Sequence, residues 1–554
     1  MREPASEPEQ GPLDWVFHYH DRTKHHFRRY AASLGWLDWD TQPDPFRTYP
    51  GAPAVRLPMP PDLEVPYDSV FTPNSLPPRP IDLAGVSDFL FHSFALSAWK
   101  QHGDSRWALR VNPSSGNLHP TEVYLLLPAV SGLSDRAALH HYVSRDHALE
   151  RRADLAGAPS GRLGNACPEG AFFLGLSSIP WRESWKYGER AWRYCQHDTG
   201  HALAAARLAA SALGWRMLLL DDLPDEDAAR ILGLDRHQEF SPEEPEEPDV
   251  LALVLPRSLH CDPRVALASV RDDPTWHGCA NRLSAGHQDW PVIDRIARAC
   301  RRRRASMPEA HGLTPAPPEP PPGPTPAPER HRPFGPLVRR RRSALGLDGR
   351  SSMSREALYP MLRRLLPGLC RAPWDLLPWP ACVHLGLFVH RVAGLDPGLY
   401  ALARSDDAVA SLRTSLRPGF AWNTPEGCPT DLPFFLLEPG DVRGVAARVS
   451  CDQDIAGDGC FSLAMLAQFE PIVRRAGAPF YRRLYWECGM IGQVLYLEAE
   501  AAGLRGTGIG CYFDDPVHEI FGIRDRGLQS LYHFTLGMPV EDPRLTTSPA
   551  YPGA

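Results

Sequence analysis

The sequence predicts two related domains, joined on one chain, that pack against each other as two subunits would. Three observations predict this organisation. A proline-rich stretch between Pro308 and Pro336 divides the 554 residues into two halves. Each half contains one long Ala/Leu-rich stretch with helical periodicity. The glycines around the two stretches have the same spacing, which indicates an internal repeat.

The repeat is defined by the stretches "YCQHDTGHALAAARLAASALGW" and "LYWECGMIGQVLYLEAEAAGL". In each stretch an acid stands two residues before a glycine, at Asp198–Gly200 and at Glu487–Gly489. The next glycine follows 14 residues later in both halves (214−200 and 503−489), and another follows 19 residues after that (233−214 and 522−503). A glycine after such a stretch is typical of a helix end. An offset of 289 residues (489−200) therefore relates the halves, and we expect a pseudo-dimer.

The composition predicts four segments in order. Residues 1–80 form an N-terminal extension, with a short helix in "YHDRTKHHFRRYA" and a proline-broken loop in "LDWDTQPDPFRTYPGA". Residues 81–300 form the first domain, residues 301–336 a proline-rich linker, and residues 337–554 the second domain. The basic run Arg301–Arg304 is interpreted as a solvated flank of the linker.

Charge and motif content argue against several function classes. The formal net charge of −7 argues against a nucleic-acid-binding surface. We find no apolar run of about 18 residues and no apolar leader at the N-terminus, so we expect neither a membrane span nor a signal peptide. The twelve cysteines show no CxxC spacing, and the histidines show no HExxH motif. We therefore expect a cytoplasmic protein with reduced thiols and no bound metal.

Five short stretches together resemble one family. They are "PSSGNLHPTE" (113–122), "WKYGERAWR" (185–193), "RRRRSALG" (339–346), "GTGIGCYFDD" (506–515) and "GMPVEDPR", which ends at Arg544. They resemble motifs of the nitroreductase-like FMN superfamily, and most closely its SagB/ThcOx (McbC-like) azoline dehydrogenase branch, here in a tandem-duplicated form. The resemblance covers residues 85–240 and 335–547. It implies an α+β fold with a mixed central sheet wrapped by helices, and FMN bound where two subunits meet.

The motifs are divided between the halves. The arginines and the glycine-rich segment stand in the second half, where the first half has Leu219, Leu220 and Asp221 opposite Gly508–Gly510. The Pro-Ser-Ser-Gly-Asn loop and the Lys186–Tyr187 pair stand in the first half, and the counterparts of that pair are Arg475 and Ala476. Because the resemblance implies that each site of the family takes parts from both subunits, we expect one composite site and one FMN per chain.

The resemblance also implies roles for individual residues. Arg341, Arg342, Ser343 and Arg544 would hold the FMN phosphate, or form a solvated basic patch at the end of the linker. Pro113, Ser114, Ser115 and Asn117 would contact the flavin ring and ribityl chain, or form an ordinary turn. Gly508, Ile509 and Gly510 would bring a backbone amide near the flavin, or end a helix. Arg110 would stabilise negative charge on the reduced flavin, or pair on the surface. Asp198, Glu487, His119 and Glu122 are interpreted as scaffold.

Lys186 and Tyr187 are the catalytic candidates. In this family the pair is the implied base that takes a proton when an azoline is oxidised to an azole, and the alternative is a Lys and a Tyr that merely pack beside Trp185. The implied function is two-electron dehydrogenation of a heterocycle or peptide-derived substrate by a monomeric pseudo-dimer, with other biosynthetic enzymes as partners. Two alternatives stay open: an NAD(P)H-dependent nitro or quinone reductase, and a non-catalytic scaffold in a peptide-modifying complex.

Overall fold

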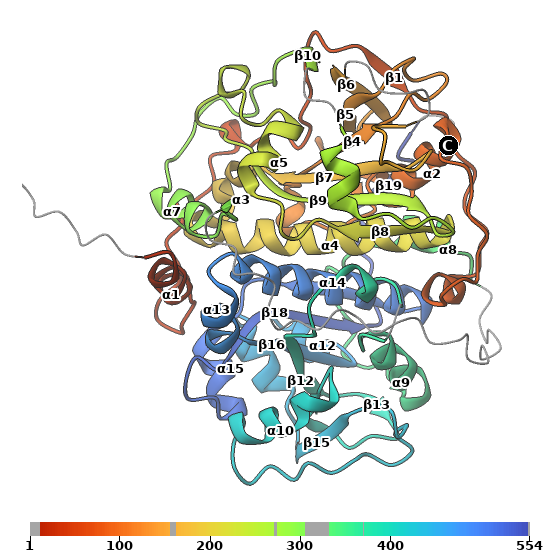
Figure 1. Cartoon of the computed structure of the whole chain (residues 1–554). Helices are drawn as coiled ribbons and strands as arrows, with labels where there is room; N and C mark the ends of the chain where they lie inside the picture. Colours follow the sequence, from red (N-terminus) through yellow and green to blue (C-terminus); the bar gives the residue numbers. More distant parts are fainter. Residues whose placement is uncertain (1–10, 156–161, 271–273, 305–331, 369–370, 552–554) are drawn as a thin grey trace, which may run out of the picture.

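The computed structural model describes residues 11–155, 162–270, 274–304, 332–368 and 371–551. Two large sheets lie at opposite ends of the molecule, and two long helices, α4 (Ala191–Ala212) and α14 (Phe480–Ala501), lie side by side between them (Figure 1). The layers therefore run sheet, helix, helix, sheet. This arrangement confirms the predicted α+β class and the pseudo-dimeric packing of the halves. Among the described residues, no helix is both long enough and apolar enough to cross a membrane.

The two sheets repeat one topology. The first has the order β1-β6-β5-β4-β7-β9-β8, with β10 beside β6, and the second has the order β15-β14-β12-β16-β18-β17. The strands of the first are β1 (Ala54–Arg56), β4 (Thr121–Leu127), β5 (Ala138–Val143), β6 (Ala148–Leu155), β7 (Phe172–Ser178), β8 (Trp215–Leu219), β9 (Glu247–Pro256) and β10 (Pro274–Trp276). Those of the second are β12 (Val383–Val389), β14 (Gly398–Leu402), β15 (Phe434–Pro439), β16 (Phe461–Gln468), β17 (Arg505–Ile509) and β18 (Leu528–Gly537). Six strands of the two sheets correspond in order: β6-β5-β4-β7-β9-β8 of the first sheet to β15-β14-β12-β16-β18-β17 of the second.

The described pairings within both sheets are antiparallel, which corrects the expectation of a mixed sheet. The parallel pair in the described chain is the short β11 (Met353–Ser354) with β13 (Val392–Ala393). A separate three-stranded sheet joins β2 (Leu96–His102) and β3 (Ser105–Arg110) to the C-terminal β19 (Thr546–Ser548). The end of the second half therefore pairs with the first half.

The remaining helices cover the outer faces and the edges of the two sheets (Figure 1). They are α1 (Pro12–Arg22), α2 (Leu83–Phe91), α3 (Pro180–Tyr187), α5 (Asp225–Leu232), α6 (Pro263–Ala268), α7 (Pro291–Ala299), α8 (Phe334–Arg340), α9 (Arg355–Arg364), α10 (Asp406–Ser415), α11 (Arg443–Val449), α12 (Ile455–Asp458), α13 (Glu470–Ala476) and α15 (Asp514–Phe521). The helix predicted over residues 19–31 is shifted: α1 begins at Pro12, where proline is favourable in a first turn, and ends at Arg22, so residues 23–31 are not helical.

The two long helices meet through reciprocal glycines. A Cβ added at Gly200 would lie 2.2 Å from the Trp486 carbonyl oxygen, and one added at Gly489 would lie 2.2 Å from the His197 carbonyl oxygen. Only glycine permits this backbone approach. The acid–glycine spacing noticed in the sequence thus marks the point where the helices cross. One apolar core surrounds the crossing and contains residues of both halves, which explains why the halves pack as one body.

A matched pair of buried ion pairs joins the halves. Arg193 of α4 donates to Asp514 at the start of α15 (Nη1–Oδ1, 2.9 Å), and Arg482 of α14 donates to Asp225 at the start of α5 (Nη2–Oδ1, 2.7 Å). Both acids stand in the first turn of a helix, where negative charge is favourable. The residues are related by the 289 offset (482−193 and 514−225), so the repeat extends to individual charges.

The predicted linker lies mostly outside the described residues, since residues 305–331 are not described. At its edges two expectations need correction. Arg302 is buried and donates to Asp225 (Nε–Oδ1, 2.7 Å), so the basic run is not wholly a solvated flank. Helix α8 begins at Phe334, inside the predicted linker range, because Phe334 and Leu337 are buried in the core.

Candidate active site

A cavity of about 470 Å³ lies where the two halves meet. The first half lines it with the end of β3, the loop that follows and one face of α4. The second half lines it with the residues after α8, with Tyr496 of α14, with the end of β17 and with residues 540–542 and 545. Of the twelve predicted cofactor-binding residues, the structure brings eleven to this cavity: Arg110, Pro113, Ser114, Ser115, Asn117, Arg341, Arg342, Ser343, Gly508, Ile509 and Gly510.

The loop after β3 is shaped by left-handed backbone and internal hydrogen bonds. Gly116 and Asn117 have φ angles of 58° and 61°. The Asn117 amide donates to the Ala108 carbonyl (Nδ2–O, 2.9 Å), and Ser115 donates its backbone amide to Asp198 (N–Oδ1, 3.0 Å). Asn117 therefore holds the loop, and one of its two amide N–H groups is already in use. A short asparagine side chain tolerates this conformation, which explains its place in the motif.

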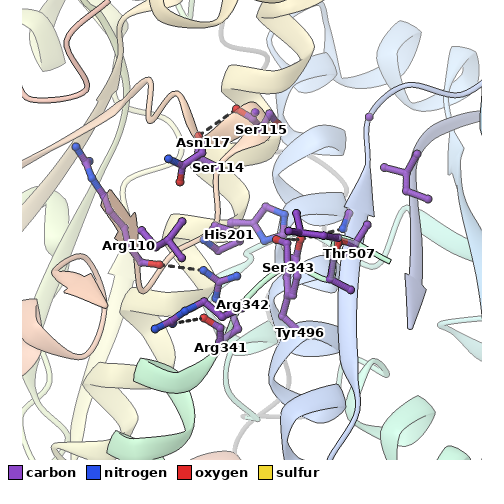
Figure 2. Close-up of a pocket in the computed structure, with 18 of the residues that line it drawn as sticks. Arg110, Ser114, Ser115, Asn117, His201, Arg341, Arg342, Ser343, Tyr496 and Thr507 are labelled. Atoms are coloured by element: carbon purple, nitrogen blue, oxygen red, sulfur yellow. Dashed lines mark hydrogen bonds between the residues drawn. The ribbon is translucent and has the colours of Figure 1, made fainter. Parts of the chain in front are cut away.

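Arg341 crosses from the second half to the first. Its guanidinium donates to the carbonyl oxygens of Val111 (Nε, 2.9 Å) and Arg110 (Nη2, 2.9 Å), so it fixes the strand end that leads into the loop (Figure 2). Arg342 donates to the Ser97 hydroxyl (Nη1–Oγ, 3.1 Å). Arg341 thus contacts the strand end that leads into the loop, although the two are more than 200 residues apart in the sequence.

Four cations on the cavity wall have no carboxylate within ion-pair distance in the described chain: Lys100, Arg110, Arg341 and Arg342. Burial lowers the pKa of Arg110 and of Arg342 to about 10, and the charge of Arg341 also lowers that of Arg342. Burial lowers the pKa of Arg341 as well. Buried cations without an acidic partner are costly. The wall is therefore suited to an anionic ligand, which would supply the missing negative charge.

The glycine-rich segment is part of a strand. Gly508 and Ile509 belong to β17 at the edge of the second sheet, and the Gly508 amide donates to the Tyr496 hydroxyl (2.9 Å), which also contacts the Ser343 hydroxyl (2.9 Å). A Cβ at Gly508 would lie 2.0 Å from the Tyr532 hydroxyl oxygen. The Gly508 amide therefore already has a partner within the chain, and the glycine makes room for a tyrosine ring.

Two predicted residues lie elsewhere. Arg544 is not among the lining residues; its guanidinium is largely exposed and pairs with Asp542 (Nη2–Oδ2, 2.7 Å). Its position in a C-terminal turn, rather than its residue type, excludes it from the buried wall. Lys186 is also absent from the wall, and its Nζ lies 5.4 Å from the centre of the Tyr187 ring.

Tyr187 does line the cavity and packs against the loop. A Cβ at Gly116 would lie 2.5 Å from the Tyr187 hydroxyl oxygen. Burial, and then the negative charges of nearby Glu183, Asp198 and other groups, raise the pKa of Tyr187 well above its usual value. This direction does not favour the base role that the resemblance implies for Tyr187, because the phenol stays protonated near neutral pH. The hydroxyl can still donate a hydrogen bond.

On one face of α4 the sequence interpretation missed Tyr194 and His201, and it assigned Asp198 to the scaffold. Tyr194, Asp198 and His201 all line the cavity, and their spacing of four and three residues places them on one side of the helix. Burial raises the pKa of Asp198 to about 7, despite hydrogen bonds from the Ser114 and Ser115 region that lower it. Burial lowers the pKa of His201 to about 3, so this imidazole is neutral. The helical spacing was the signal that could have found these residues.

At the position related to the cavity by the 289 offset, ion-paired arginines stand where the cavity has tyrosines. Arg207, the counterpart of Tyr496, pairs with Asp375 (Nη2–Oδ2, 2.5 Å). Arg483, the counterpart of Tyr194, pairs with Asp221 (Nη1–Oδ2, 3.3 Å), and its guanidinium carbon lies 5.1 Å from the centre of the Trp379 ring. The cations on this side have carboxylate partners, in contrast to those of the cavity.

Comparisons with known proteins agree with this architecture. The nitroreductase family model matches residues 104–241. A solved structure from Anabaena variabilis that carries the name nitroreductase superposes with a TM-score of 0.65 at 20% identity, over 95% of this chain and 99% of that chain. The chain has the nitroreductase fold. No curated protein matches the sequence.

Two further structures are similar over part of the chain. A Ralstonia eutropha protein that carries the same name has a TM-score of 0.27 at 17% identity, over 41% of this chain and 98% of that chain. The E. coli microcin synthetase McbBCD complex has a TM-score of 0.25 at 19% identity, over 45% of this chain and 93% of that chain.

Proposed function

We propose that the chain is an FMN-dependent oxidoreductase with a single composite site between its halves. The observation that carries this proposal is the cavity wall, where buried arginines of both halves lack acidic partners in the described chain. A phosphate dianion accepts charge-assisted hydrogen bonds from such groups. The cavity volume of about 470 Å³ is in the range of cofactor sites.

The other lining residues also fit a polar aromatic cofactor. Arg110, Asn112, His119 and His201 each keep a buried side-chain atom without a hydrogen-bond partner among the described residues (Nε, Oδ1, Nδ1 and Nδ1). Buried polar atoms of this kind normally have partners. A bound flavin ring with its carbonyl and imine groups would offer donors and acceptors to this wall, while Tyr187 and Tyr194 would supply aromatic contact.

Bound at this site, FMN would supply a two-electron acceptor. Arg341 and Arg342 would hold its phosphate, and the loop from Pro113 to Asn117, held by its own hydrogen bonds, would hold its ring. Asp198, whose pKa is raised to about 7 by burial, can exchange a proton at its carboxylate near neutral pH.

The finer proposal is dehydrogenation of an azoline, or of a related ring in a peptide-derived substrate, to the aromatic azole. It rests on the resemblance of "WKYGERAWR" to the family's Lys-Tyr motif. Lys186→Ala tests it: if Lys186 takes the substrate proton, turnover should fall by roughly two to four orders of magnitude while FMN stays bound. Unchanged turnover would refute the role of Lys186 and direct attention to Asp198.

The cofactor assignment is tested by flavin content and affinity. The reconstituted chain should contain one FMN per 554 residues. Arg341→Ala should weaken FMN binding by about 10- to 150-fold, the loss expected for a hydrogen bond to a charged group. Arg340→Ala is the matched control, because Arg340 is exposed and lies outside the cavity wall.

Three outcomes separate the alternatives. A flavin ratio near two would contradict the single site. Rapid bleaching of the bound flavin by NADPH would favour a nitro or quinone reductase over the dehydrogenase. A chain that stays colourless after incubation with FMN would favour the scaffold and refute the cofactor assignment.

A further inference from the structure

Two cysteines from distant segments meet beside the cavity. Cys511 follows β17 and lines the cavity, and Cys451 lies in a left-handed turn after α11 with a φ angle of 58°. Their sulfur atoms are 2.8 Å apart and both side chains are half-buried. A disulfide bond of ~2.05 Å would require the sulfurs to approach by less than ~1 Å. The two thiols are therefore placed to share a proton or to form a bond.

A histidine from the N-terminal extension completes the group. A ring nitrogen of His25 and the two sulfurs lie within 4.8 Å of one another. His25 is buried, and neither of its ring nitrogens has a hydrogen-bond partner in the described chain. Its ring packs edge-on against Tyr30, with ring centres 4.9 Å apart. This placement puts a ring nitrogen beside both sulfurs, and the charge of Arg190, after burial, lowers the pKa of His25.

The charges around the pair favour a thiolate. Arg190 donates to the Gly510 carbonyl (Nη2–O, 3.2 Å), one residue before Cys511, and Arg190 and Arg193 share the single carboxylate of Asp514. Two guanidinium groups against one carboxylate leave a local positive charge, which a thiolate would neutralise. The hydrogen bond from Cys451, together with His25 and Arg190, lowers the pKa of Cys511 below its usual value, whereas the same hydrogen bond and burial raise the pKa of Cys451.

A metal ion is the competing occupant of this group. Zinc bound to both sulfurs at ~2.3 Å in tetrahedral geometry would hold them about 3.8 Å apart, wider than the 2.8 Å observed. The two nearby arginines also disfavour a cation. Distance and charge thus both favour thiol chemistry over metal binding.

We propose that Cys511 and Cys451 form a redox-active pair that is oxidised by low-molecular-weight disulfides. The Cys511 thiolate attacks one sulfur of the disulfide, forms a mixed disulfide and releases a thiolate. That thiolate takes the proton of Cys451, whose sulfur then attacks Cys511 Sγ and releases the second thiolate. The protein loses two electrons and becomes a disulfide, and the small disulfide is reduced to one thiol and one thiolate.

The bond would form on the cavity rim. The Gln453 amide already donates to the Cys511 carbonyl (Nε2–O, 3.0 Å) and, like Cys511, lines the cavity. A disulfide would add a covalent link between the turn that carries Gln453 and the end of β17. Oxidation would therefore fix one wall of the site, and reduction would release it.

The experiment uses the full-length chain equilibrated with reduced and oxidised glutathione, quenched with acid, alkylated with N-ethylmaleimide and digested for mass spectrometry. Oxidising buffer should give a peptide pair linked through Cys451 and Cys511. Cys451→Ser should leave Cys511 as a mixed disulfide with glutathione, and Cys511→Ser should give neither product. The exposed Cys279 is the internal control, which should form a mixed disulfide only.

A second measurement does not depend on substitution at the cysteines. Alkylation of Cys511 should become half-maximal below the pH of about 8.5 usual for a free thiol, and His25→Ala should move that midpoint upward. The proposal is overturned if both cysteines remain alkylated in oxidising buffer. It is equally overturned if the purified chain retains one zinc ion that protects the two thiols from alkylation, and if a chelator removes both the zinc and this protection.

Discussion

The buried carboxyl group of Asp198 makes stability depend on pH in a definite direction. Its pKa is raised to about 7 in the folded chain, against about 3.9 when unfolded. Between these values the folded chain binds a proton that the unfolded chain does not. The free energy of unfolding therefore falls as pH rises, by about 1.4 kcal/mol per pH unit, and the total over three units is about 4 kcal/mol.

Asp198→Asn removes this dependence while it keeps the hydrogen bonds. The Asn carbonyl can accept from the Ser115 amide and hydroxyl, which now lie 3.0 and 3.1 Å from Asp198 Oδ1. We expect the variant to match the parent near pH 4 and to exceed it by about 4 kcal/mol above pH 7. The Asp198 charge is one cause of the raised pKa of buried Glu183, so Asp198→Asn also lowers that pKa. A lower pKa of Glu183 further raises the free energy of unfolding of the variant at high pH.

Urea unfolding followed by tryptophan fluorescence from pH 4.5 to 8.5 measures the effect. The matched control is Glu487→Gln at the related position. Glu487 is buried against Arg404, so its removal leaves an unpaired buried cation and should destabilise the chain by about 3–5 kcal/mol at neutral pH. If parent and Asp198→Asn lose stability with the same slope between pH 4.5 and 7, Asp198 does not hold the raised pKa.

Two further changes test the frame of the site. Asp514→Asn and Asp225→Asn should each destabilise the chain by about 3–5 kcal/mol in urea unfolding, because each leaves a buried arginine charge unpaired. If either variant is as stable as the parent, the ion pairs between the two halves do not contribute as described. Gly510→Ala places a methyl group 2.2 Å from a ring carbon of Tyr194, so it should release bound flavin while the circular dichroism spectrum is unchanged. Gly346→Ala is the control and should retain flavin, because nothing in the described chain lies within 4 Å of its added methyl group. Equal retention of flavin by both variants would refute the steric argument.

The repeat was predictable because it depends on residues whose role is local. Gly214 and Gly503 end the long helices with φ angles of 70° and 76°, and Gly200 and Gly489 mark their crossing. These positions need glycine for steric reasons, so their spacing is preserved in the sequence. The strand after the turn loop was also predictable, since β4 is a run of seven buried residues.

The site was predictable in part. Motif order identified the loop and Arg341, but not which polar groups were already satisfied. Asn117 and Gly508 have partners within the chain, and only the folded structure reveals these partners. Asp198 was interpreted as scaffold because its raised pKa comes from burial, which no local pattern records. Arg544 has the right charge but stands in an exposed turn.

The two halves lie on one chain, and this changes how the site can vary. In a symmetric dimer every substitution appears twice, so a residue that improves one side of a shared site also alters its copy. Here Tyr496 lines the cavity while Arg207 fills the related position against Asp375, and each can change alone. One half can therefore remain a rigid wall of the site while the other half changes to bind a new ligand. Two identical subunits cannot change independently in this way.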